Sequence, residues 1–258
     1  MGIRCVYTDL DGTLLGAGAS LFRTAEGDFT LLAARALEAC HRAGAEVVIK
    51  SGRRRVQVME DARLIGQTSY IFEVGAGMVI DGETTFLTGD LQPRDGQSVH
   101  DQIAAGGAPD LLLGHFDGRL EYHAPFHVGR EVSHVFRGSV DALEANELLA
   151  AEGHSALRLV DNGEIGPSTH TFHLIPAGVS KARAVAAHMR ARGYQREECV
   201  AVGDSREDLD VAEVVGRMFL VANAAVGEGS GHPNVERTEG AMSEGFYEAI
   251  IRSLAETS

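Results

Sequence analysis

The chain contains few cysteines and no long apolar run, and these absences exclude several classes of protein. Its 258 residues include three cysteines, Cys5, Cys40 and Cys199, and no Cys-x-x-Cys pair. We therefore expect buried free thiols. No hydrophobic run is long enough to span a bilayer, and the first residues enter a strand-like segment without the basic and apolar regions of a signal peptide. We expect a cytoplasmic protein that does not enter a membrane.

Positive charge is also scarce. Lysine and arginine number 23 against 37 aspartates and glutamates, which gives a formal net charge of −14. Such a charge repels polyphosphate backbones, and the sequence has no basic stripe beyond Arg53, Arg54 and Arg55. We therefore predict that nucleic acid is not a partner. The oligomeric state does not follow from the sequence.

Near the N-terminus, an apolar strand-like segment delivers two carboxylates. Residues 3–8 are followed by Asp9 and Asp11, and then by Gly12 and Thr13. Side chains of a strand alternate with a period of two, so both carboxylates point the same way where the strand ends. Two anions this close repel each other unless a metal or a shared proton intervenes, so the pair predicts a divalent cation. The alternative is a plain turn, in which Asp and Gly are common.

A second apolar segment, residues 45–50, ends in Ser51, Gly52 and Arg53. A hydroxyl beside a free glycine amide can hydrogen-bond a phosphoryl oxygen. Taken singly, a Ser-Gly pair is also typical of a turn. Arg53 follows it directly and is a candidate substrate contact, because it lies beside the expected phosphate position.

In two further segments, a charged residue stands at the expected start of a helix or the expected end of a strand. Lys181 opens a helical pattern that stops near Gly193, although lysine is unfavourable at the positive end of a helix dipole. Such a lysine either has a role elsewhere or is solvated on the surface. Residues 199–203 form a strand-like run that ends at Asp204, and Asp208 follows about one helical turn later. Helix capping alone also produces such an acidic start.

In this order, the four segments resemble the four motifs of the haloacid dehalogenase superfamily, from Asp9 to Asp208. The resemblance is to the branch with a large C2-type cap between the second and third motifs. This branch includes Cof-type sugar phosphatases, sucrose-phosphate phosphatase and mannosyl-3-phosphoglycerate phosphatase. It implies an α/β fold with a Rossmann-like, doubly wound parallel sheet as its core (residues 1–82 and 178–258). Residues 83–177 are then an inserted α+β cap domain that determines substrate specificity.

The resemblance also implies a function, that of a magnesium-dependent phosphatase acting on a small phosphorylated metabolite, foremost a sugar phosphate or sugar-acid phosphate. Asp9 would attack phosphorus to form an aspartyl-phosphate. Asp11 would protonate the leaving group and then deprotonate the hydrolytic water. The residues implied to bind the phosphate are Ser51, Gly52, Arg53 and Lys181.

The implied metal site consists of oxygen ligands. Asp9, the backbone carbonyl of Asp11 and Asp204 would ligate Mg²⁺, and Asp208 would lie against a metal-bound water or Lys181. Magnesium prefers such hard oxygen ligands. A phosphoryl-transfer transition state spreads negative charge over its oxygens, so catalysis is largely positioning and charge neutralisation. The implied roles agree with this chemistry.

The chain pattern independently predicts a parallel sheet with helices on both faces, because apolar strands alternate with helical stretches. Its length exceeds that of a usual single domain, and 44% hydrophobic residues suffice for a sizeable core. Between about residues 83 and 177 the pattern changes to short strands separated by turns. Helices are expected near residues 32–43, 54–65, 140–151, 181–192 and 246–254. Further strands are expected at residues 70–74, 111–113, 120–122, 157–160, 171–175 and 218–224.

Several positions allow more than one interpretation. Glu207 stands where many capped relatives have Asn, and it could add a metal contact, alter the pKa of Asp208 or point to solvent. Asn223 either shapes the rim of the active site or belongs to a turn. Some cap residues could meet an anionic or hydroxylated leaving group or equally be solvated. These are Arg119, His123, His127, Arg130 and Arg158.

Other functions fit part of the pattern. A phosphomutase of the phosphomannomutase type shares the first motif and a comparable cap, but nothing marks a bisphosphate site. A phospho-accepting signalling domain also combines acids, a hydroxyl and a lysine on a parallel sheet, but such domains are much shorter and lack a cap. A zinc site at His123 and His127, or at His170 and His173, is disfavoured because the surroundings resemble strands and loops.

Overall fold

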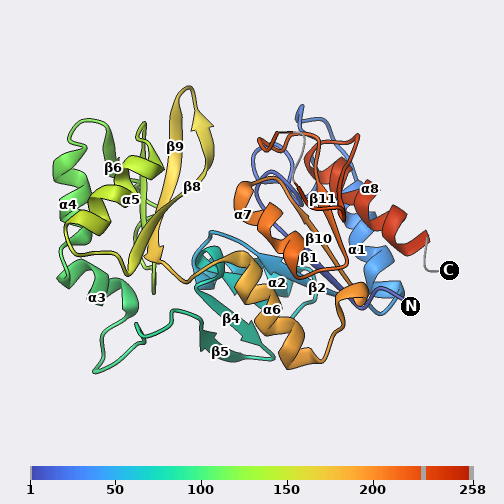
Figure 1. Ribbon diagram of the computed structural model, residues 1–258. Coiled ribbons are helices and arrows are strands. Elements are labelled where there is room, and N and C mark those ends of the chain that lie inside the picture. Colours follow the sequence, from blue (N-terminus) through green and yellow to red (C-terminus); the bar gives the residue numbers. More distant parts are fainter. Residues whose placement is uncertain (1, 228–230, 256–258) are drawn as a thin grey trace.

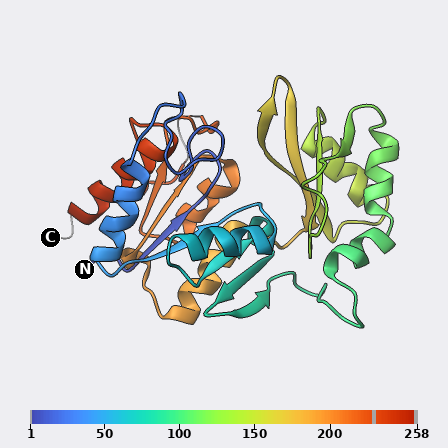
Figure 2. The ribbon, with the colours of Figure 1, turned by 180° about the vertical axis from the view of Figure 1, so that it is seen from behind.

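The computed structural model describes residues 2–227 and 231–255, which form two β-sheets with helices packed against them. Figure 1 shows the two sheets side by side, with both ends of the chain at the larger one. The view from behind in Figure 2 shows the same division. The chain leaves the large sheet for the small one and then returns.

The large sheet has eight strands in the order β12-β11-β10-β1-β2-β3-β4-β5. The pairings from β12 to β3 are parallel, whereas β4 and β5 form an antiparallel hairpin at one edge. This parallel centre confirms the predicted Rossmann-like core. Its strands are β1 (Cys5–Thr8), β2 (Glu46–Lys50), β3 (Tyr70–Phe72), β4 (Gly77–Ile80), β5 (Glu83–Phe86), β10 (Cys199–Gly203), β11 (Arg217–Leu220) and β12 (Val235–Arg237).

Helices cover both faces of the large sheet, because its central strands are apolar on both sides. Val6 and Val47 lie in the hydrophobic cluster that includes residues of α1, α2 and α8. Tyr7 and Val48, one residue further along each strand, lie in the cluster that includes residues of α6 and α7. The helices are α1 (Leu32–Arg42), α2 (Arg55–Leu64), α6 (Lys181–Arg192), α7 (Arg206–Leu209) and α8 (Met242–Ala255).

The small sheet is antiparallel, in the order β6-β7-β9-β8. It packs against three helices through a separate core that includes Phe116, Phe136 and Phe172. Residues 87–177 are called the small-sheet segment below. Its strands are β6 (Leu120–Tyr122), β7 (His134–Gly138), β8 (Leu157–Gly166) and β9 (Thr169–Pro176). Its helices are α3 (Val99–Ala105), α4 (Ala108–His115) and α5 (Ala142–Ala151).

One predicted strand is wrong. Residues 111–113 lie in α4, whose first turn contains Pro109. Proline is favoured there because its missing N–H has no partner in a helix and its φ is already helical. Only Leu112 of the three leucines is fully buried. A short apolar run does not distinguish a strand from a helix by periodicity, which explains the error.

Several element borders also differ from expectation, among them the start of α8 at Met242 and the end of β8 at Gly166. Strand β5 (Glu83–Phe86) is an edge strand of the large sheet, so residues 83–86 lie with that sheet and not with the segment expected to be the cap. Strand β3 ends at Phe72, because Glu73 and Val74 have φ values of 48° and 60° and form a tight turn. Strand β11 ends at Leu220, before residue 224.

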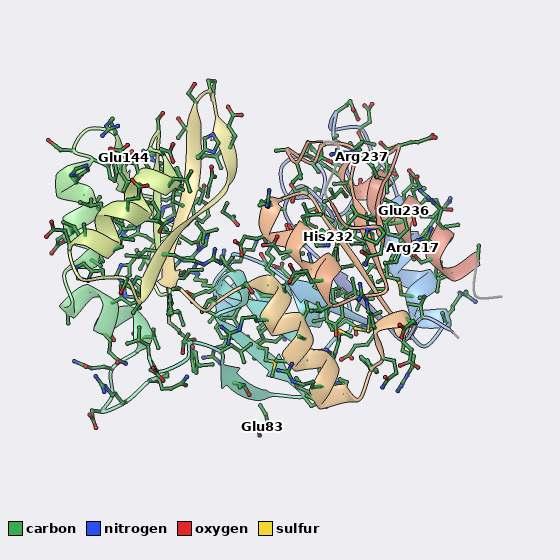
Figure 3. The ribbon with its side chains drawn as sticks, in the orientation of Figure 1. Glu83, Glu144, Arg217, His232, Glu236 and Arg237 are labelled. Carbon is green, nitrogen blue, oxygen red and sulfur yellow. The ribbon has the colours of Figure 1, made fainter. Side chains whose placement is uncertain are left out.

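Figure 3 labels several charged side chains of the two sheets. Arg217 and Glu236, labelled in Figure 3, form an ion pair between β11 and β12. Figure 3 also shows Glu144 of α5 on the side of the small sheet that is remote from the large sheet.

The three cysteines are buried and free, as predicted. In the described parts of the chain, no helix combines the length and apolar character that crossing a membrane requires.

The core of the small sheet supplies a stability test. Phe136 is fully buried, so Phe136→Ala should lower the free energy of unfolding by about 3–5 kcal/mol. Leu143→Ala is the control, because this side chain is 75% exposed, and its effect should stay within about 0.5 kcal/mol. Urea denaturation followed by circular dichroism measures both. Equal destabilisation by the two changes would contradict the described core.

Candidate active site

Three adjacent strands bring the predicted motifs to one edge of the large sheet. Strand β1 lies between β2 and β10, and all three run parallel. Asp9, Ser51 and Asp204 each directly follow one of these strands, so they meet at the same carboxyl edge. The backbone N–H of Asp9 donates to the carbonyl oxygen of Val202 at 3.1 Å, which fixes the end of β1 against β10.

Lys181 joins this edge from the first residue of α6. Ser180 caps the helix by accepting from the backbone N–H of Arg183, so Lys181 starts the first turn. Its ammonium group donates to Oδ1 of Asp9 at 2.7 Å and to Oδ1 of Asp208 at 2.9 Å. Burial opposes its charge, but the two carboxylates outweigh this effect and raise the pKa of Lys181. The unfavourable helix position is therefore offset by two buried ion pairs.

Three carboxylates form a cluster beside this lysine. Asp9, Asp204 and Asp208 each offer an oxygen, and these oxygens lie within 4.8 Å of one another. Burial raises the pKa of Asp9 to about 6. Burial, followed by the charges of Asp9 and Asp208, raises the pKa of Asp204 to about 8. Such mutual repulsion is what a divalent cation relieves, and a set of carboxylate oxygens fits Mg²⁺.

Asp208 is held on both of its oxygens. Oδ2 accepts from the hydroxyl and the backbone N–H of Ser205 in a capping box at the start of α7. Oδ1 accepts from the ammonium groups of Lys181 and Lys50. Burial would raise the pKa of Asp208, but the two lysines hold it well below its ordinary value. A Cβ at Gly203 would lie 2.3 Å from Cβ of Asp208, so glycine permits this close approach.

The side chain of Asp11 lies outside the carboxylate cluster. Arg53 donates to it through Nε at 2.9 Å and Nη2 at 2.6 Å, and through Nη1 to Asp61 at 3.0 Å. An arginine thus engages the carboxylate of Asp11, while Asp204 and Asp208 are the carboxylates grouped with Asp9. Gly12 allows this grouping, since its φ is 78° and a Cβ there would lie 2.2 Å from Oδ2 of Asp204.

The loop after β2 contacts the small-sheet segment. Ser51 is buried, and its hydroxyl accepts from the backbone N–H of Arg53. The carbonyl oxygen of Gly52 accepts from Nη1 of Arg130 at 2.9 Å. A Cβ at Gly52 would lie 3.2 Å from Nε2 of His173 and 3.3 Å from Nδ2 of Asn162. Strands β8 and β9 thus bring polar side chains to the expected phosphate position.

Comparisons with known proteins show the family of the chain. A family model for haloacid dehalogenase-like hydrolases matches residues 149–227. A phosphoglycolate phosphatase from Halorubrum lacusprofundi is 30% identical over 219 residues, which cover 84% of this chain and 83% of that protein. The chain belongs to the haloacid dehalogenase-like hydrolases. It is a phosphoric monoester hydrolase, as further relatives named phosphatases also indicate.

Solved structures show that this hydrolase shares its fold with distant relatives. Thermoplasma acidophilum 0175 matches with a TM-score of 0.69 and 17% identity, covering 98% of this chain and 99% of that one. The sucrose-phosphatase of Synechocystis sp. PCC6803 matches with a TM-score of 0.68 and 16% identity, covering 98% of both chains. The α/β core and the family predicted from the motifs are confirmed.

Glu207, for which the sequence left several roles open, pairs with an arginine of the small-sheet segment. Nη1 and Nη2 of Arg158, on β8, each donate to one oxygen of Glu207 at 3.1 Å. Arg158 also donates to the carbonyl oxygen of Val179 at 2.7 Å. The Glu207 side chain is only 8% exposed, so it does not point to solvent. The sequence analysis did not predict this ion pair between Glu207 and the small-sheet segment.

The other cap candidates of the hydrolase occupy different surroundings. Arg130 is buried and reaches Gly52, as described. Arg119 stacks over the ring of Phe116 within the small-sheet segment. His123 lies beside Thr171, and His127 stacks on Tyr122. At the rim, Asn223 donates to the carbonyl oxygen of Gly12 at 2.9 Å and so braces that turn.

Sequence reasoning missed Lys50, Asn162 and the position of His173 beside Gly52. The signal for Lys50 was present, because a charged residue follows three buried apolar residues at the end of the strand. The signal for the other two was absent. Their position depends on how β8 and β9 meet the loop after β2, which no local pattern encodes.

The pairing of Asp208 with two lysines leads to a stability prediction. Asp208→Asn leaves Lys50 without its carboxylate and Lys181 with Asp9 alone, which should cost about 3–5 kcal/mol of the free energy of unfolding. Urea denaturation without added metal measures this loss. Asp210→Asn is the control, because this carboxylate is partly exposed and pairs only loosely with Arg206. An unchanged midpoint for Asp208→Asn would contradict the assigned pairing.

Proposed function

We propose that this hydrolase is a magnesium-dependent phosphatase that forms an aspartyl-phosphate on Asp9 and acts on a small phosphorylated metabolite. One observation carries the proposal. Lys181 bridges Asp9 and Asp208 while Asp204 lies within 4.8 Å of both carboxylates, although these residues are dispersed along the chain. A nucleophilic carboxylate, a phosphate-binding ammonium and oxygen ligands for a cation are thus gathered in one place.

In the proposed reaction, an oxygen of Asp9 attacks phosphorus and the leaving-group oxygen takes a proton from Asp11. Water then attacks the phosphorus of the aspartyl-phosphate and gives a proton to Asp11. This step releases phosphate and restores the carboxylate of Asp9. Asp9 has a pKa raised by burial to about 6, so it is ionised at neutral pH. The exposed position of Asp11 gives it access to the leaving group and to water.

The phosphoryl oxygens would be held by Ser51, the backbone N–H of Gly52, Arg53 and Lys181. Arg53 now engages Asp11 and Asp61, so it would exchange part of this pairing for the substrate. Asp9, Asp204 and the backbone carbonyl of Asp11 would hold Mg²⁺. The cation supplies neutralisation of the charge that develops on the phosphoryl oxygens.

We further propose that the small-sheet segment acts as a cap that selects the substrate. Its Arg130, Asn162 and His173 lie against Gly52, beside the phosphate position. Burial and nearby cations lower the pKa of His173, so it is a neutral hydrogen-bonding group there. Neutral donors with arginines suit a hydroxylated or carboxylated leaving group, so a sugar phosphate or sugar-acid phosphate is the proposed substrate class. Relatives named phosphoglycolate phosphatases add 2-phosphoglycolate as a candidate.

The nucleophile assignment is tested by Asp9→Asn. An amide cannot form an aspartyl-phosphate, so turnover should fall by more than about 10⁴-fold. Steady-state release of inorganic phosphate measures this loss. Asp141→Asn, at the N-cap of α5 in the small-sheet segment, keeps a capping side chain and should retain normal turnover. Substantial activity in Asp9→Asn excludes the covalent route.

The substrate class is tested by comparing kcat/KM across sugar phosphates, sugar-acid phosphates, 2-phosphoglycolate, nucleotides and phosphoamino acids. We expect the highest values among the sugar and acid phosphates, because the cap-side groups bind hydroxyls and carboxylates. A preference for nucleotides or phosphoamino acids would overturn this assignment. Conversion of a sugar 1-phosphate to a 6-phosphate without phosphate release would instead favour the phosphomutase.

A further inference from the structure

Lys50 is a buried cation that the proposed reaction does not use. The sequence contains only two lysines, Lys50 and Lys181, and the remaining basic residues are arginines. Both lysines are buried, and both donate to Oδ1 of Asp208. Both lysine ammonium groups are therefore concentrated at a single carboxylate of the candidate active site.

The backbone around Lys50 determines where its charge lies. It is the last residue of β2, and its Nζ donates to the carbonyl oxygen of Val202 at 3.1 Å. The same oxygen accepts from the backbone N–H of Asp9 at 3.1 Å. Since β1 lies between β2 and β10, the Lys50 side chain reaches across the end of β1, next to the backbone of Asp9.

The Lys50 side chain is 0% exposed, and its ammonium group donates to Asp208 and Val202, so we assign it no contact with the substrate. Its influence on the site is therefore electrostatic. When all groups are ionised, Asp9, Asp204 and Asp208 face two ammonium groups, and the cluster has a formal charge of −1. Lys50 donates to Oδ1 of Asp208, and Asp208 offers an oxygen within 4.8 Å of oxygens of Asp9 and Asp204. The charge of Lys50 therefore lies close to both proposed metal ligands.

We propose that Lys50 is a positioning residue that sets the charge balance of the site, so that it weakens binding of Mg²⁺ and strengthens binding of the phosphoryl dianion. A fixed positive charge next to the cluster repels a divalent cation and attracts a dianion, and a low-dielectric interior makes both effects large. Lys50 also neutralises part of the charge of Asp208. Lys181 can therefore turn from Asp208 toward the phosphoryl group without leaving this carboxylate unpaired. This inference rests on the proposed function.

The test uses Lys50→Met and Lys50→Gln in the full chain. Isothermal titration calorimetry at pH 8 measures the Kd of Mg²⁺ alone, and then the Kd of orthophosphate at saturating Mg²⁺. In both variants we expect the Kd of Mg²⁺ to fall and that of orthophosphate to rise, each by about tenfold. Glutamine keeps a donor for Asp208 or Val202 without the charge. Agreement between the variants therefore assigns the effect to charge.

The outcomes separate this inference from the function on which it rests. If the wild-type chain binds no Mg²⁺, or Asp204→Asn binds it unchanged, the proposed function fails. If the wild type binds Mg²⁺ and both Lys50 variants shift the two constants in the same direction, or not at all, the charge-balance role is wrong. The role would also be wrong if Lys50→Gln kept both wild-type constants while Lys50→Met changed them, because the hydrogen bond and not the charge would then matter. Arg196→Met, at the opposite end of β10, should change neither constant.

A second measurement does not depend on the folding of these variants. With only two lysines, wild-type protein labelled with ¹⁵N-lysine gives two side-chain ammonium signals. Both should shift on addition of Mg²⁺ and again on addition of orthophosphate, because both ammonium groups face the cluster. A signal that stays unchanged through both additions would show that one lysine does not sense the site, and would overturn the inference.

Discussion

The buried group of carboxylates and ammonium ions around Asp208 is the interaction on which the structure of the site depends. Asp208 joins Lys181 from α6, Lys50 from β2 and Ser205 before α7, so one carboxylate ties three elements to the end of β10. Burying so many charges is costly unless each is paired and hydrogen-bonded. Because Asp208, Lys50, Lys181 and Asp9 are each paired, the cluster holds Asp9 and Lys181 in fixed positions and leaves Asp9 close to Asp204.

The sheet topology explains why distant motifs meet. In a parallel doubly wound sheet, the carboxyl ends of neighbouring strands share one edge, and ligands bind there. Strands β10, β1 and β2 are neighbours, so Asp204, Asp9 and Ser51 need no further device to converge. Two glycines permit the close approach of the aspartates, since side chains at Gly12 and Gly203 would displace Asp204 and Asp208.

Local patterns predicted the large sheet, the family and the motif positions, because strand ends and helix starts are encoded by a few adjacent residues. They did not predict the pairings between distant segments. Arg53 with Asp11, Arg158 with Glu207, and Lys50 with Asp208 depend on how separate elements approach one another. The same limit applies to α4, where a run of leucines fits a strand as well as a helix until its packing partners are known.

The central claim is that Asp9 carries the phosphoryl group during turnover. Rapid acid quenching during hydrolysis, borohydride reduction of the acyl phosphate and peptide mass spectrometry test it most directly, because reduction converts an aspartyl-phosphate to homoserine. The account predicts homoserine at position 9, formed only when substrate is present. Homoserine at another aspartate, or none while phosphate is being released, would contradict it.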